Sequence, residues 1–127
     1  MKQRVRTDKA PGAIGPYSQA LISNGIVYTS GQIGIDPSTG KLVEGGLEEQ
    51  AHRVLQNVKA VLEAAGTSLD NVVRTTVFLS TMDNFAAMNA IYVEYFNTDT
   101  PPARSTIAAA GLPLGALIEV DTIATLD

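Results

Sequence analysis

One arginine stands out among the residues of this chain that could do chemistry. Arg104 lies in PPARSTIAAAG, a stretch that is otherwise small and apolar and that we interpret as a β-strand. An arginine among such neighbours needs an anionic partner. That partner is either an internal carboxylate, for which Glu119 is the best candidate, or the carboxylate of a bound ligand, which the planar guanidinium grips with two hydrogen bonds. The residues by themselves favour the two alternatives about equally.

The path of the chain decides whether Arg104 and Glu119 meet. Both are equally far from Gly111-Leu112, so a simple hairpin of the strands expected at 103–110 and 116–126 would make them a cross-strand pair. If the first of these strands instead returns parallel after a helix, the two need not pair directly. Both paths are compatible with a pocket that holds one cation and one carboxylate.

Two loops and one helix supply further candidates. Tyr17 in IGPY and Ser30-Gly31 in TSGQ offer a phenol, a hydroxyl and an unhindered backbone N–H, although each is also a common turn residue. Asn89, in a helix expected at 83–96, could cap a loop or reach a ligand. The single histidine, His52, lies off the apolar face of its helix, and we expect it to be a solvated surface residue.

Several classes of chemistry find no support in the sequence. There are no cysteines, so disulfides, thiolate catalysis and cysteine-based zinc sites are excluded. No phosphate-binding loop, serine-hydrolase elbow or metal-spaced cluster is present. The net charge is −4, and four of the nine basic residues (Lys2, Arg4, Arg6, Lys9) stand at the start rather than in a basic stripe with interleaved aromatics. We therefore expect no nucleic-acid partner, no membrane partner and a cytoplasmic location.

The elements that position the candidates follow from periodicity. Apolar residues recur at helical spacing over 47–65, two glutamates open that helix, and Gly66 ends it. Strands are expected at 3–6, on either side of the Asn24-Gly25 turn, and at 72–80. We predict a single domain over residues 1–127, an α+β fold in which two helices cover one face of a sheet. Residues 72–79 carry apolar side chains on both faces of the expected strand, with Val73, Val77 and Leu79 on one face and Val72 and Phe78 on the other. The helices cover only one face, so we expect self-association to bury the other.

Four segments together resemble the Rid (YjgF/RidA) family of reactive-intermediate deaminases over essentially the whole chain. They are AIGPYSQA (13–20), YTSGQIGIDPSTG (28–40), NVKAVLEAAG (57–66) and PPARSTIAAAGLPLGALIEV (101–120). The resemblance implies a chorismate-mutase-like two-layer fold with one mixed six-stranded sheet and two helices on one face. It also implies a homotrimer with clefts between subunits, and hydrolysis of 2-iminobutanoate and 2-iminopropanoate to 2-keto acids and ammonia without cofactor or metal.

The resemblance also implies roles for particular residues. The family's catalytic arginine and carboxylate fall on Arg104 and Glu119, and its substrate-binding loop residues on Tyr17, Ser30 and Gly31. Asn89 matches the family's helix asparagine. Thr106 stands where many deaminases have cysteine, a position that contributes through its backbone. A metabolite sensor without catalysis is the second hypothesis, and an endoribonuclease or translation inhibitor is the third.

Overall fold

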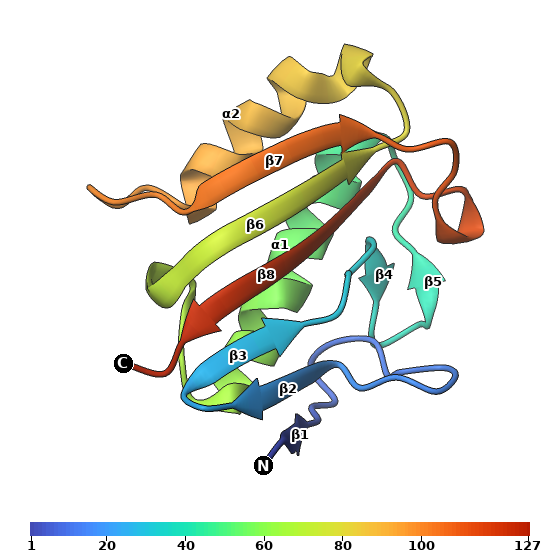
Figure 1. Cartoon of the computed structure of the whole chain (residues 1–127). Helices are drawn as coiled ribbons and strands as arrows, with labels where there is room; N and C mark the ends of the chain where they lie inside the picture. The colour runs from blue at the N-terminus through green and yellow to red at the C-terminus, as the bar shows by residue number, and fades with distance from the viewer.

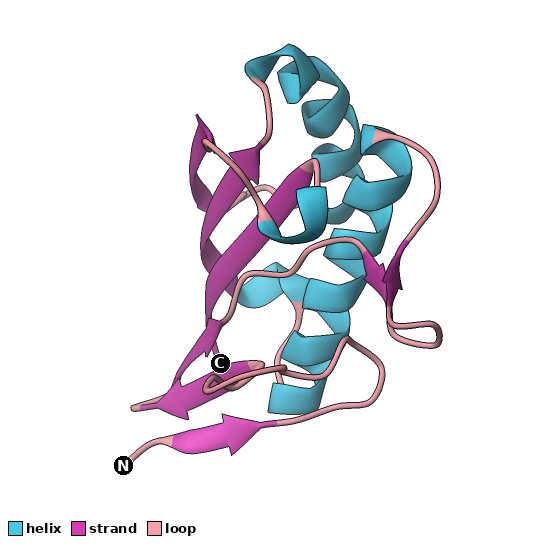
Figure 2. Cartoon of the chain, turned by 90° about the vertical axis from the view of Figure 1, so that its right-hand side faces the viewer, coloured by secondary structure: helices cyan, strands magenta, loops and turns pink.

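The computed structural model describes residues 1–127 and shows a six-stranded sheet with two helices packed on one of its faces (Figures 1 and 2). The elements are β1 (Gln3–Val5), β2 (Ala20–Ser23), β3 (Ile26–Thr29), β4 (Ile35–Asp36), β5 (Lys41–Leu42), α1 (Leu47–Ala65), β6 (Val72–Leu79), α2 (Phe85–Tyr95), β7 (Ala103–Ala108) and β8 (Ile118–Thr125). The predicted α+β two-layer fold is confirmed. No helix is both long and apolar enough to cross a lipid bilayer.

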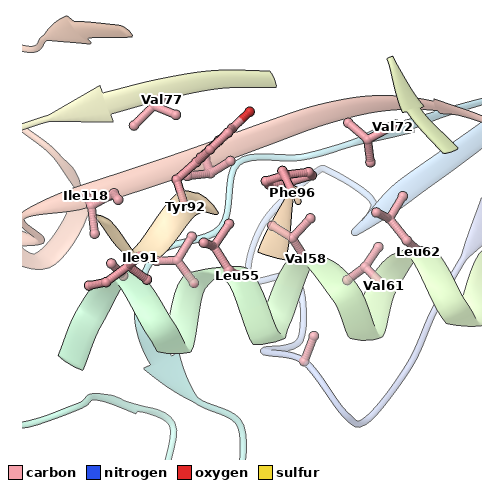
Figure 3. Packing of buried hydrophobic residues seen from close by; sticks show 14 of the residues in the cluster. Leu55, Val58, Val61, Leu62, Val72, Val77, Ile91, Tyr92, Phe96 and Ile118 are labelled. Carbon is pink, nitrogen blue, oxygen red and sulfur yellow. The ribbon is translucent and has the colours of Figure 1, made fainter. Parts of the chain in front are cut away.

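The first helix forms where the periodicity predicts it, at Leu47–Ala65. Glu49 accepts a hydrogen bond of 2.8 Å from the backbone N–H of Gly46, which satisfies one free donor at the helix start. Gly66 ends the helix in the left-handed region, with φ at 93°. The apolar side of α1 lies against the sheet, and Leu55, Val58 and Leu62 are buried there (Figure 3).

The order of the strands in the sheet is β1-β2-β3-β8-β6-β7. Strand β7 pairs in parallel with β6, and β8 pairs antiparallel with the other side of β6. The last two strands therefore do not form a hairpin, and β6 lies between them (Figure 1). The parallel return is the second of the two paths considered above, and it makes β7 an edge strand.

A bulge in β6 changes which side chains face the helices. The register shifts between Val72 and Arg74, so Val72 is buried under the helices and Val73 is 49% exposed. The predicted grouping of Val73 with Val77 and Leu79 is therefore wrong, because strict alternation fails at the bulge. Beyond it, Val77 and Leu79 are buried against the helices and Phe78 lies on the other face.

The sheet face away from the helices is open in the single chain (Figure 2). By register it carries a row of side chains from successive strands, and several of them are apolar: Leu21, Tyr28, Ile123, Phe78 and Ile107. Tyr28 and Ile107 are 46% and 48% exposed. Such a face is typical of a surface that packs against another molecule.

Two turns complete the frame. Asn24 and Gly25 both have positive φ angles, 53° and 76°, as the predicted type I′ hairpin turn between β2 and β3 requires. The second turn, at 36–40, joins β4 and β5 into a separate two-stranded ribbon that the sequence did not predict.

Candidate active site

Arg104 lies on the helix-facing side of the edge strand β7, in register with the buried Thr75 of β6. Its Nη1 donates a hydrogen bond of 2.7 Å to Oδ1 of Asn89 on α2. The guanidinium carbon lies 4.7 Å from the ring centroid of Tyr92 and 5.6 Å from that of Phe85. The partners of Arg104 within the chain are thus an amide oxygen and two ring faces, and none is a carboxylate.

Tyr92 is itself fixed in place. Its phenol oxygen lies 2.8 Å from Oγ1 of Thr75, which is fully buried. Because both partners of this contact are held in the core, the ring is a rigid surface on which the guanidinium stacks. Asn89 holds one guanidinium nitrogen from the side, so the remaining N–H groups are available to another acceptor.

A cavity of about 540 Å³ opens beside this arginine, between α2, the segment after it and the start of β7. Its lining contains no carboxylate and consists of Asn89, Tyr92, Val93, Phe96, Asn97, Thr98, Pro101 and Arg104. An apolar cavity with one cation at its wall suits a small ligand with one negative charge.

Thr106 lies two residues further along β7, on the same face as Arg104. Its Oγ1 is buried and has no hydrogen-bond partner within the chain. A buried hydroxyl without a partner is destabilising, and such groups are found most often where function or a further partner explains them. The unpaired hydroxyl therefore makes this part of β7 a candidate contact for a ligand or for another copy of the chain.

Glu119 lies on the opposite face of the sheet. It is in register with Phe78, three positions along β6 from the partner of Arg104, and side chains alternate between the faces of a strand. Gly31 lies against its carboxylate: a Cβ built on Gly31 would meet the carboxylate carbon at 2.8 Å. Any side chain at position 31 would displace this carboxylate.

Burial makes the carboxyl group of Glu119 a weaker acid than usual. Removal from water raises the pKa of the Glu119 carboxyl above its ordinary value, and the charge of Asp121, two residues along the same face of β8, raises the pKa further. A carboxylate with a raised pKa is a better proton acceptor than an ordinary surface glutamate. This environment suits a general base.

Tyr17 and Ser30 line a second cavity, of about 620 Å³, near β1, β2 and β3. The hydroxyl of Ser30 donates a hydrogen bond of 2.6 Å to the carbonyl oxygen of Ser18, which ties the end of β3 to the loop before β2. Tyr17 is 53% exposed, so its phenol is accessible. Gly31 and its neighbour Gln32 continue from Ser30 to β8, where Gln32 pairs with Val120.

The candidate residues thus form two groups. Arg104, Asn89 and Thr106 lie together beside α2, whereas Glu119 and Gly31 lie together on the open side with the Tyr17 loop nearby. Between the Cα atoms of Arg104 and Glu119 there are two strand spacings and three residues of strand length, roughly 14 Å, and the side chains point to opposite faces. One chain by itself does not bring the two groups into one pocket.

Comparison with known proteins places the chain in a protein family. Residues 7–126 match the family model described as Endoribonuclease L-PSP. The human protein named 2-iminobutanoate/2-iminopropanoate deaminase is 47% identical over 124 residues, which cover 98% of this chain and 90% of the human one. The chain belongs to the Rid (YjgF) family.

Solved structures of Rid-related proteins agree closely with this one. A Rid family protein of unknown function from Yersinia pestis is 50% identical, with a TM-score of 0.96 and coverage of 98% of this chain and 99% of that one. Escherichia coli TdcF, solved with bound serine, is 38% identical, with a TM-score of 0.92 and coverage of 97% and 98%. The Rid fold of the present chain is therefore shown by both sequence and structure.

The sequence analysis did not identify every residue that contacts Arg104. Tyr92 and Phe85 lie in the helix expected at 83–96, and nothing in their spacing predicts that they form the stacking surface for Arg104. Asn89, for which the sequence leaves a loop cap or a ligand contact open and which matches the family's helix asparagine, accepts a hydrogen bond from the guanidinium of Arg104. The expectation that His52 is simply solvated is wrong, because its Nδ1 lies 2.9 Å from the phenol oxygen of Tyr95 and joins the two helices.

Proposed function

We propose that this chain hydrolyses small 2-imino acids, such as 2-iminobutanoate and 2-iminopropanoate, to 2-keto acids and ammonia. The observation that carries the proposal is the state of Arg104, which is positioned by Asn89 and Tyr92 but has no carboxylate partner of its own. An oriented guanidinium with free donors is a receptor for a substrate carboxylate. The human relative that is named for this reaction, and the amino acid bound to TdcF, support a substrate of this size and charge.

The chemistry requires only positioning and one base. Arg104 holds the substrate carboxylate and so fixes the adjacent C=N carbon. Glu119 accepts a proton from a water molecule as that water attacks the carbon, which gives a tetrahedral amino alcohol. Glu119 returns this proton to the nitrogen, the C–N bond breaks and ammonia leaves, and the hydroxyl group loses its proton as the C=O bond forms. Because an iminium carbon is already electrophilic, orientation and general base catalysis supply a large part of the rate enhancement.

We further propose that two copies of the chain complete each site, in a homotrimer. Arg104 lies at one edge of the sheet and the Tyr17 loop near the other, and Glu119 faces away from Arg104. The apolar side chains of the open sheet face support burial against further copies. In this arrangement one subunit supplies Arg104, Asn89 and Thr106, and its neighbour supplies Glu119, Gly31, Ser30 and Tyr17.

A mixing experiment tests function and assembly together. Arg104→Ala and Glu119→Gln should each lose nearly all ammonia release from 2-iminobutanoate, generated in the assay from an amino acid by an amino-acid oxidase. When equal amounts of the two inactive variants are unfolded together and refolded, random trimers should regain about a quarter of the parent activity, because one site in four combines two intact residues. No recovery, in mixtures shown by mass spectrometry to contain both chains, would contradict the shared site.

The Glu119→Gln variant also separates the enzyme from the sensor. Both hypotheses need Arg104, whereas only hydrolysis needs the base. Retained binding of 2-oxobutanoate with lost turnover supports the enzyme, and undiminished turnover contradicts the proposed role of Glu119. A parent protein that binds the keto acid but hydrolyses no imine is a sensor.

A further inference from the structure

The cavity beside Tyr17 and Ser30 contains a pair of positive charges that the proposed reaction does not use. Its lining consists of Lys2, Arg4, Pro16, Tyr17, Ser18, Ala20, Leu21, Tyr28, Thr29 and Ser30. Lys2 and Arg4 are the charged residues of this set, and both side chains are exposed. No aspartate or glutamate lines the cavity, although the chain as a whole has a net charge of −4. The local excess of positive charge attracts anions.

Arg4 belongs to β1, and Lys2 directly precedes that strand. Arg4 is in register with Leu21 of β2, and Leu21 with Tyr28 of β3, so the three side chains form one row on the open face. Val5, the next residue of β1, is only 5% exposed and lies in the core. The strand therefore holds Arg4 on the cavity side.

A buried glutamine anchors the segment that follows β1. The side chain of Gln19 is 3% exposed; its Oε1 accepts a hydrogen bond of 2.8 Å from the backbone N–H of Thr7. Its Nε2 donates to the carbonyl oxygens of Thr7, at 3.1 Å, and Pro11, at 2.8 Å. Because Gln19 directly precedes β2 and lies two residues after Tyr17, these hydrogen bonds tie the segment that follows β1 to the loop that carries Tyr17.

We propose that Lys2 and Arg4 bind a second carboxylate of the substrate, so that the protein hydrolyses acidic 2-imino acids such as the imines of aspartate and glutamate. This inference rests on the proposed function, in which Tyr17 and Ser30 contact the imine while Arg104 of a neighbouring copy holds its first carboxylate. A side chain that extends from the imine carbon past Tyr17 enters the cavity that Lys2 and Arg4 line. Charge-assisted hydrogen bonds from the two cations then hold its terminal carboxylate.

The test uses a charge-matched pair of double variants. Lys2→Gln/Arg4→Gln removes the two cations of the cavity, and Arg6→Gln/Lys9→Gln removes two exposed cations of the same segment that do not line it. Each protein is assayed for ammonia release from the imine of glutamate and from 2-iminobutanoate. The binding of 2-oxoglutarate and 2-oxobutanoate is measured by calorimetry, and unfolding curves establish that all three proteins are folded.

The expected result is selective. The Lys2→Gln/Arg4→Gln variant should lose about tenfold or more in kcat/KM for the glutamate imine and a similar factor in 2-oxoglutarate affinity, with less than a twofold change for the four-carbon compounds. The Arg6→Gln/Lys9→Gln variant should behave as the parent does. Equal losses for both substrates, or equal losses in both double variants, would overturn the proposal, since the cations would then act only through general charge.

Failure of this inference and failure of the proposed function give different results. A parent that hydrolyses 2-iminobutanoate but neither hydrolyses the glutamate imine nor binds 2-oxoglutarate overturns the second-carboxylate site alone. A parent that hydrolyses neither imine overturns the deaminase proposal. Binding of a short RNA that is lost in Lys2→Gln/Arg4→Gln, without any 2-oxoglutarate binding, would assign the cations to a different ligand and overturn the inference.

Discussion

Replacing Arg104 by alanine tests whether this residue binds the substrate carboxylate or belongs to a structural ion pair. The test compares the loss in the free energy of unfolding with the loss in kcat/KM. The change removes one hydrogen bond to Asn89 and the stacking on Tyr92 and Phe85. A charge-assisted hydrogen bond contributes about 1.5–3 kcal/mol and a half-exposed cation–π contact about 0.5–1 kcal/mol. Because water can replace part of these contacts at an edge strand, we expect a loss of about 2 kcal/mol in the free energy of unfolding.

The expected effect on catalysis is larger. Two charge-assisted hydrogen bonds to the substrate carboxylate, at about 1.5–3 kcal/mol each, correspond to a loss of roughly 10²- to 10⁴-fold in kcat/KM. An arginine whose main partner is an internal carboxylate would give a different pattern. Breaking a buried ion pair costs about 3–5 kcal/mol of stability, and activity then falls only as far as the fold is lost.

Arg53 provides a matched control for this experiment. Its Nε donates a hydrogen bond of 3.0 Å to Oδ1 of Asn57, so Arg53→Ala also removes an arginine–asparagine contact. Arg53 lies on α1 and lines neither of the two cavities described above. Urea unfolding and the coupled ammonia assay should show a stability loss without a catalytic loss. A decrease of less than tenfold in kcat/KM for Arg104→Ala, with the protein folded, would refute the assignment of Arg104 as the carboxylate receptor.

Three further predictions concern the two faces of the sheet. Gly31→Ala should leave the unfolding free energy nearly unchanged but lower kcat at least tenfold, because the new methyl group displaces the flexible Glu119 carboxylate; unfolding curves and ammonia release measure both. Thr106→Val should raise stability by about 1 kcal/mol in urea unfolding, because it removes a buried unpaired hydroxyl, and should alter kcat/KM less than threefold if position 106 acts through its backbone. The acid limb of the pH profile of kcat/KM should lie above the range of an ordinary glutamate, because the pKa of Glu119 is raised. Asp121→Asn removes one cause of this shift and should move the limb to lower pH. An unmoved limb would show that Glu119 is not the titrating base.

The same raised pKa values carry a consequence for stability. An acid whose pKa is higher in the folded chain than in the unfolded one favours folding below its unfolded pKa, and that contribution is lost as the pH rises through its folded pKa. Glu119 and Asp121 both have raised pKa values, mainly through burial. At neutral pH the two ionised carboxylates on the open face therefore lower the free energy of unfolding. Such a cost is typical of residues that are kept for function rather than for folding.

Much of the fold followed from local physics. Helix α1 was predicted to the residue, because its apolar period, its first-turn glutamates and Gly66 all agree. The turn at Asn24-Gly25 followed from the positive φ angles that it needs. Such features depend on a few neighbouring residues, so a sequence contains all the information that they require.

The arrangement of the site depended on pairings that no local pattern specifies. Whether Arg104 meets Glu119 is decided by the insertion of β8 on one side of β6 and β7 on the other. The bulge after Val72 could not be seen in the alternation, because an extra residue in one strand has no signal of its own. The stacking of Arg104 on Tyr92 likewise depends on how α2 crosses the edge strand.

The division of the candidate residues between two faces has a consequence for how activity must depend on concentration. Because Arg104 and Glu119 are in register with Thr75 and Phe78, an odd number of residues apart on β6, no rotamer change brings both into one cavity of the same chain. If both are needed for hydrolysis, the active species is an assembly, and dilution below its dissociation constant must remove activity without unfolding the chain. Activity that stays proportional to concentration in a sample shown by light scattering to be monomeric would exclude the shared site, and one of the two residues would then have no role in the reaction.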